Sequence, residues 1–146
     1  MKFLLCGYFH GRIPNKLISI AKKEKVDYIL STGDFNNADK LRKIIFKNWK
    51  SKKSLEEILG KKKFNRLFKE YISSGKKVLK KINSLNLPII TCYGNNDESS
   101  KSPQHRDKKK NKKDYIETLV KNLKNIEFLD FRYKKIGDYF IYFMGG

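Results

Sequence analysis

The sequence predicts one α/β domain built on a mainly parallel sheet with helices packed against it. Three observations support this prediction. The length of 146 residues fits a single domain. A content of 39% hydrophobic and 13% aromatic residues is enough to form a core. Short apolar runs alternate with stretches of helical periodicity, in the order β-α-β-α-α-β-loop-α-β-β, and such alternation is typical of parallel strands joined by right-handed crossovers.

The first half of the chain alternates strands with helices. Residues 2–6 form a compact apolar run, which indicates a buried strand, and residues 26–32 form a second one. Between them, residues 16–25 carry apolar side chains at helical spacing. After a turn at residues 33–37, residues 40–49 predict a second helix.

A long amphipathic stretch follows. Ser54 and Glu57 have the spacing of a capping box, which predicts the start of a helix. From Phe64 to Leu85, apolar residues recur at steps of three and four and define one helical face. We expect Gly75 to weaken or break this helix, because glycine is a poor helix former.

The second half begins with a predicted strand at residues 87–92 and a Lys-rich mobile loop at residues 98–113. Residues 114–125 predict a further helix. Strand-like runs follow at residues 126–131, 133–136 and 139–144, of which the last two resemble a hairpin. Because the chain stops directly after an apolar strand, we expect the single domain of residues 1–146 to be incomplete at its C-terminus, as a fragment or a prematurely ended gene product.

The charge of the chain is strongly positive. There are 34 Lys and Arg against 15 Asp and Glu, a formal net charge of +19. This charge has two interpretations, a solvated Lys-rich surface or a surface that binds nucleic acid. No apolar run approaches the ~20 residues that span a bilayer, so no membrane association is expected. Two cysteines and no export signal favour a cytoplasmic location.

Polar side chains follow the first three predicted strands, where the strands end. They are Tyr8 and His10, then Asp34, then Asn95, Asn96 and Asp97. The carboxyl ends of parallel strands meet at one edge of a sheet, where ligands bind. Nitrogen and oxygen donors of this kind suit Mn²⁺, Fe²⁺, Zn²⁺ or Mg²⁺. Each residue also has a structural interpretation, since Asp and Asn are ordinary turn formers.

These loops together resemble the calcineurin-like metallophosphoesterase superfamily. The matching motifs are Tyr8-Phe9-His10-Gly11, Gly33-Asp34 and Gly94-Asn95-Asn96-Asp97, in the order and strand context of that family. The resemblance covers the whole chain as the amino-terminal portion of a two-sheet sandwich flanked by helices. It implies hydrolysis of a phosphomonoester or phosphodiester, with a phosphorylated substrate as the partner.

The resemblance also implies a role for each motif residue. Two divalent metal ions (Mn, Fe, Zn or Mg), about 3.5–4 Å apart, would clamp the phosphate and generate a hydroxide. His10 would bind the first metal, Asp34 would bridge both, and Asn95 would bind the second. Asp97 would hold neighbouring groups by hydrogen bonds.

Three departures from the family pattern predict an impaired enzyme. Tyr8 stands where the family has a metal-binding aspartate, and a neutral phenol is a poor ligand for a dication. Asn96 stands at the catalytic position of the histidine that protonates the leaving group, and a carboxamide cannot donate a proton there. The family's Gly-His-x-His motif is absent, and His105 in the Lys-rich loop is not expected to be a ligand. The alternative is a non-catalytic basic module that binds nucleic acid or another polyanion.

Overall fold

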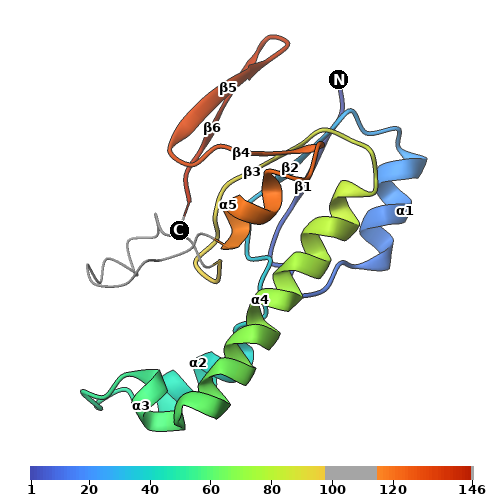
Figure 1. Cartoon of the computed structure of the whole chain (residues 1–146). Coiled ribbons are helices and arrows are strands. Elements are labelled where there is room, and N and C mark those ends of the chain that lie inside the picture. The colour runs from blue at the N-terminus through green and yellow to red at the C-terminus, as the bar shows by residue number, and fades with distance from the viewer. Residues whose placement is uncertain (98–114, 146) are drawn as a thin grey trace.

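The computed structural model describes residues 1–97 and 115–145 (Figure 1). Its elements are β1 (Phe3–Cys6), α1 (Asn15–Lys23), β2 (Tyr28–Ser31), α2 (Asp39–Lys47), α3 (Leu55–Leu59), α4 (Lys61–Asn83), β3 (Ile89–Thr91), α5 (Tyr115–Val120), β4 (Ile126–Phe128), β5 (Arg132–Ile136) and β6 (Tyr139–Phe143). The expected order omitted one helix, because α3 and α4 separate at Gly60, and one of the three final strands. The predicted mobile loop at 98–113, with His105, lies outside the described residues.

The prediction of an α/β fold with a parallel sheet is confirmed. Four parallel strands pair in the order β1-β2-β3-β4. Residues Leu4 and Ile29 are partners across the first pair, and Ile29 and Ile89 across the second. The loops after β1, β2 and β3 therefore leave the sheet at the same edge, which positions the site described below.

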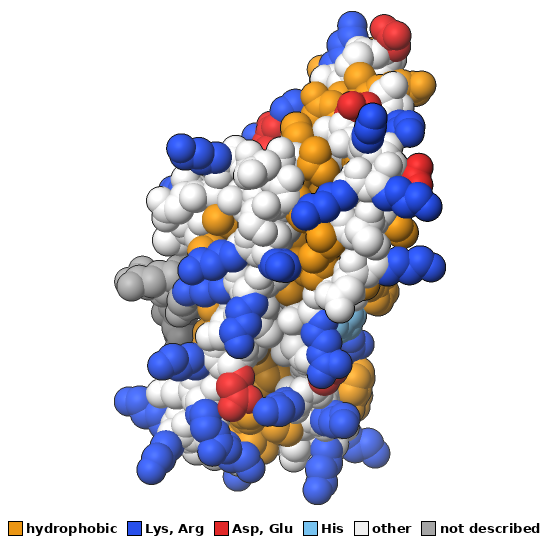
Figure 2. All heavy atoms as spheres, turned by 90° about the vertical axis from the view of Figure 1, so that its right-hand side faces the viewer, with side chains coloured by type: hydrophobic (Ala, Val, Ile, Leu, Met, Phe, Trp, Pro, Cys, Tyr) orange, Lys and Arg blue, Asp and Glu red, His pale blue; other side chains and the backbone are white. Residues whose placement is uncertain are grey.

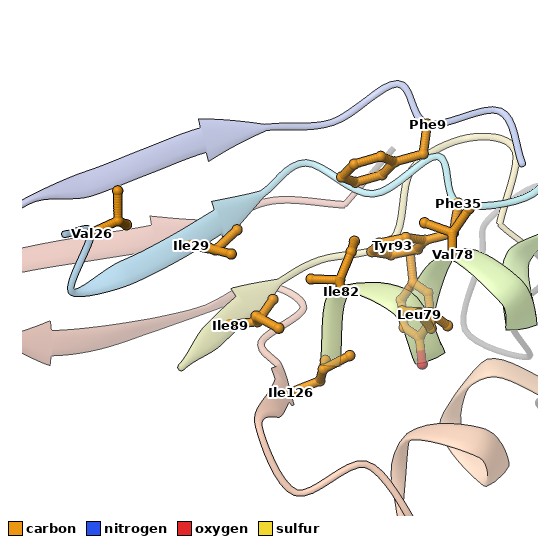
Figure 3. Packing of buried hydrophobic residues seen from close by; sticks show 10 residues of the cluster. All are labelled: Phe9, Val26, Ile29, Phe35, Val78, Leu79, Ile82, Ile89, Tyr93 and Ile126. Atoms are coloured by element: carbon orange, nitrogen blue, oxygen red, sulfur yellow. The ribbon is translucent and has the colours of Figure 1, made fainter. Parts of the chain in front are cut away.

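One face of the sheet is covered by helices. Val78, Leu79 and Ile82 of α4 belong to one buried cluster with Ile29 of β2 and Ile89 of β3 (Figure 3). All five are buried. Apolar side chains at positions three and four apart put one stripe of α4 on the sheet, and fully burying such a side chain is worth about 1.5–3 kcal/mol.

The other face of the sheet packs against the antiparallel hairpin of β5 and β6. Ile136 and Phe143 point inward and join Leu30 and Ile90 in a second buried cluster. The hairpin and the helices α1 and α4 thus lie on opposite sides of the sheet (Figure 1). The predicted hairpin at the end of the chain is present, with Gly137 at its turn in the left-handed region.

The two cysteines belong to different faces. Cys6 packs against the cluster under the helices, whereas Cys92 belongs to the cluster under the hairpin. Both thiols are free. Burial raises the pKa of Cys6 to about 12, and burial, with Asp130 nearby, raises the pKa of Cys92. Neither thiol therefore has the lowered pKa of a reactive cysteine.

The longest helix, α4, runs unbroken for 23 residues. Gly75 was expected to weaken or break this helix, and it does not break it. Gly75 is buried where the loop after β2 crosses the helix, and a Cβ at this position would lie 1.9 Å from Oδ1 of Asn36. Glycine is needed here for close packing. Within the described residues, no helix has the length and apolar content needed to cross a bilayer.

Replacing Gly75 with alanine should destabilise the fold by about 1–2 kcal/mol, because overpacking outweighs the gain of about 1 kcal/mol in helix propensity. Lys76→Ala on the neighbouring exposed position is the control, and it should change stability by less than about 0.5 kcal/mol. Urea unfolding followed by circular dichroism measures both. A more stable Gly75→Ala variant would contradict this packing.

Candidate functional site

Backbone hydrogen bonds join the loops that follow the first three strands. The N–H of His10 donates to the carbonyl of Asp34, 2.9 Å away, and the N–H of Gly11 donates to the carbonyl of Phe35 at 2.9 Å. The N–H of Asn96 donates to Oδ1 of Asp34, also at 2.9 Å. Loops that are up to about 90 residues apart in the chain are thus held side by side at one sheet edge, as the parallel topology dictates.

Asp97 ties the loops after β2 and β3 together. Its Oδ2 accepts from the N–H groups of Asp34 (2.7 Å) and Gly94 (2.9 Å). Its Oδ1 accepts from the N–H groups of Phe35 (2.7 Å) and Asn36 (3.2 Å). Burial raises the pKa of this carboxyl to about 6, although all four N–H groups act to lower it. Asp97 therefore positions the site, and its oxygens already have four donors.

Two glycines allow these loops to approach closely. A Cβ on Gly33 would lie 2.2 Å from the backbone nitrogen of Gly94, and a Cβ on Gly94 would lie 2.2 Å from Oδ1 of Asp34. Gly33 also has a φ of +82°, which glycine adopts without penalty. The Gly-Asp and Gly-Asn pairs of the sequence thus reflect a contact between two loops as well as a tight turn.

The backbone is strained at three of the candidate residues. Tyr8, His10 and Asp34 have φ values of 56°, 45° and 61°, in the left-handed region that non-glycine residues seldom occupy. Such conformations cost about 1–3 kcal/mol each and cluster at functional sites. Hydrogen bonds between the loops hold His10 and Asp34 in these conformations.

The candidate side chains differ in exposure. Asp34 and Asn96 are buried, and the hydroxyl of Tyr71 donates to the carbonyl of Asn96 at 2.6 Å. Asn95, by contrast, is exposed. Tyr8 is 76% exposed, and its ring lies 5.5 Å from the half-buried ring of His10.

Helix α4 contributes contacts that no motif indicated. The N–H of Asn37 donates to Oγ of Ser74 at 2.7 Å, which fixes the loop after β2 to the helix. Asn36 is buried against Gly75, and its Nδ2 has no hydrogen-bond partner in the described part of the chain. The sequence carries no signal for these contacts, because Ser74 and Gly75 lie almost 40 residues away in an ordinary helical pattern.

Few side chains that could bind a metal ion lie at this edge. Among residues 1–97 and 115–145, no three His, Cys, Asp or Glu side chains gather closely enough to hold a metal ion. His10, Asp34 and Asn95 supply one imidazole, one carboxylate and one carboxamide at the shared edge. Because Asp97 is engaged by four N–H groups, Asp34 brings the one negative charge of this set, which suits a single divalent cation better than a pair.

Comparison with known proteins shows the fold alone. The chain matches no family model and no curated protein. It is similar to a solved crystal structure, with a TM-score of 0.63 and 15% sequence identity. The match covers 92% of this chain and 48% of the other, so the chain spans about half the length of that structure.

Proposed function

We propose that the shared loop edge is a phosphoesterase site that uses a divalent cation. The observation that carries this proposal is the joining of His10, Asp34 and Asn96 by hydrogen bonds at the carboxyl ends of three parallel strands, with strained backbone at two of them. Open α/β sheets bind ligands at this edge.

Each residue has a definite task in this proposal. Asp34 supplies the carboxylate for the cation, and the N–H of Asn96 orients it through Oδ1. His10 supplies a nitrogen ligand and Asn95 a carboxamide oxygen. A cation held by these groups would polarise a phosphate ester and activate a water molecule. The two-metal centre that the family resemblance implies would need a further carboxylate, at position 8.

The substrate is a phosphate ester with a good leaving group. Asn96 can donate a hydrogen bond but no proton, so the leaving group must depart as an anion or take a proton from water.

The positive surface favours an anionic substrate. Lys and Arg side chains far outnumber Asp and Glu on the face shown in Figure 2, and the net charge of +19 raises the local concentration of anions. A cytoplasmic location, with its reducing conditions, would keep both thiols free.

Replacing Asp34 with asparagine should weaken Mn²⁺ binding at least about tenfold, a loss of about 1.4 kcal/mol. Asparagine keeps an oxygen for the N–H of Asn96 and tolerates the left-handed backbone, so the loss reports the missing charge. Isothermal titration calorimetry measures the affinity, and hydrolysis of bis(p-nitrophenyl) phosphate measures the activity.

The control is Asp39→Asn, which removes the same charge from an exposed position at the start of α2. This variant should bind Mn²⁺ as the unmodified chain does. Equal Mn²⁺ binding by Asp34→Asn and the unmodified chain would exclude Asp34 as a ligand and overturn the proposed site.

A further inference from the structure

Exposed aromatic side chains lie at the solvent-facing side of α2 and in the turn that follows it. Arg42 and Phe46 are one helical turn apart on α2, and Trp49 follows in the turn directly after the helix. Phe46 is 61% and Trp49 74% exposed, and their rings stack at 6.4 Å with an interplanar angle of 20°. The guanidinium of Arg42 lies 5.9 Å from the Phe46 ring. The opposite face of α2 packs Leu41 against α4.

A hollow of about 300 Å³ opens beside Trp49. Its walls are apolar at Leu55 and Ile58 of α3 and polar at Asn48 and Ser51. The side-chain amide of Asn48 donates to the carbonyl of Ile44 at 2.8 Å, so the carboxamide is held in place. A flat aromatic molecule with polar edges fits such a hollow, because one wall is a ring and others offer hydrogen bonds.

The same segment is densely cationic. Residues 40–53 contain six lysines and one arginine, and no aspartate or glutamate. Lys40 is engaged with Glu70 of α4, at 2.7 Å. Lys50, Lys52 and Lys53 are exposed in the turn between α2 and α3. The helices α2 and α3 lie at the end of α4 that is remote from the sheet (Figure 1), which leaves this region open to a large partner.

We propose that this helical arm, residues 39–59, binds single-stranded nucleic acid, with an unpaired base on Trp49 and phosphates at the lysines. Exposed rings interleaved with cations are the means by which proteins hold single strands, since every base has a face to stack. A base pair would keep that face covered, so a single strand is preferred to a duplex. The proposal is independent of the metal site.

An anionic membrane is the less favoured partner. The exposed apolar side chains here are few, with Ile45 and Phe46 on a helix of nine residues and Trp49 in the turn after it. Membrane-surface helices depend on a larger buried apolar area. The polar wall of the hollow, at Asn48 and Ser51, would also lose water without a partner in the acyl region, whereas a base can bond to it.

The sole tryptophan of the chain is Trp49, so its fluorescence reports on this surface directly. Titration with a 20-nucleotide oligodeoxythymidylate should quench that emission, and fluorescence anisotropy of the labelled oligonucleotide should give the same dissociation constant. Trp49→Leu, which keeps an apolar side chain, should weaken binding about 5- to 150-fold, the fold-change for one stacked base. Circular dichroism should show that the fold of this exposed-site variant is unchanged.

Two triple variants that remove the same amount of charge distinguish binding at the arm from binding through the overall positive charge. One variant combines Lys50→Gln, Lys52→Gln and Lys53→Gln. It should reduce the magnitude of the slope of log affinity against log salt by about 2. The control is Lys16→Gln, Lys22→Gln and Lys23→Gln on α1, which removes three charges from another exposed surface and should change the slope much less.

Three results would overturn the proposal. The first is an equal reduction of the salt slope in both triple variants, and the second is an unchanged affinity for the oligonucleotide in Trp49→Leu. The third is a blue shift of Trp49 emission with phosphatidylserine vesicles, without quenching by the oligonucleotide. Quenching by the single strand, with weaker quenching by its duplex, supports it.

Discussion

Replacing Tyr8 with aspartate should tighten Mn²⁺ binding by about ten- to a hundredfold, equivalent to about 1.4–2.7 kcal/mol. Tyr8 lies beside His10 at the loop edge and is 76% exposed, so the change adds a carboxylate without opening a cavity. Its φ of 56° also suits aspartate better than tyrosine. The stronger site should raise the hydrolysis of bis(p-nitrophenyl) phosphate by a similar factor.

The matched control is Tyr8→Asn. Asparagine has the shape of aspartate and its tolerance of the left-handed backbone, but it brings no charge. It should leave Mn²⁺ affinity within a factor of about three, a difference of ~0.7 kcal/mol. Isothermal titration calorimetry compares the three chains. If Tyr8→Asp bound Mn²⁺ no better than Tyr8→Asn, position 8 would not face the cation, and the family interpretation of the first motif would be wrong.

Replacing Asp97 with asparagine should destabilise the chain by about 2–6 kcal/mol, since two buried N–H groups lose their acceptor at a cost of about 1–3 kcal/mol each. Each carboxylate oxygen accepts two backbone N–H groups. An asparagine must turn its NH₂ group toward two of these donors, whichever way it is placed. Two buried N–H groups then have no acceptor, and the loops after β2 and β3 separate.

Urea unfolding followed by circular dichroism at 222 nm measures this loss. Asp138→Asn, in the exposed hairpin turn, is the control and should change stability by less than about 0.5 kcal/mol. An Asp97→Asn chain as stable as this control would show that the four N–H groups find other acceptors. It would also remove the reason for treating Asp97 as the residue that fixes the loops.

The sequence was sufficient to predict that the loops after the first three strands lie at one edge of the sheet. Apolar runs and helical spacing predicted the strands, and parallel topology then placed the loops of His10, Asp34 and Asn96 at one edge. That argument needs only the direction of each strand, which follows from helical crossovers. The structure adds that the loops are bonded to one another through their backbones.

The orientation of individual side chains could not be predicted. Asn95 and Asn96 are chemically identical neighbours. Which one is buried depends on the turn that Asp97 fixes by accepting the N–H groups of Gly94 and Asp34, which are 3 and 63 residues away in the chain. The packing role of Gly75 could not be predicted for the same reason. Helix propensity describes a residue alone, whereas its contact with Asn36 depends on how the loop after β2 crosses α4.

Mn²⁺ added in small amounts to the ¹⁵N-labelled chain tests directly whether one cation binds at the shared edge. Paramagnetic broadening falls steeply with distance, so the amide signals of His10, Asp34 and Asn96 should disappear first. The indole N–H of Trp49, on the remote arm, should stay sharp at the same ratio of metal to protein. Loop signals that persist until the Trp49 signal also broadens would contradict a metal site at this edge.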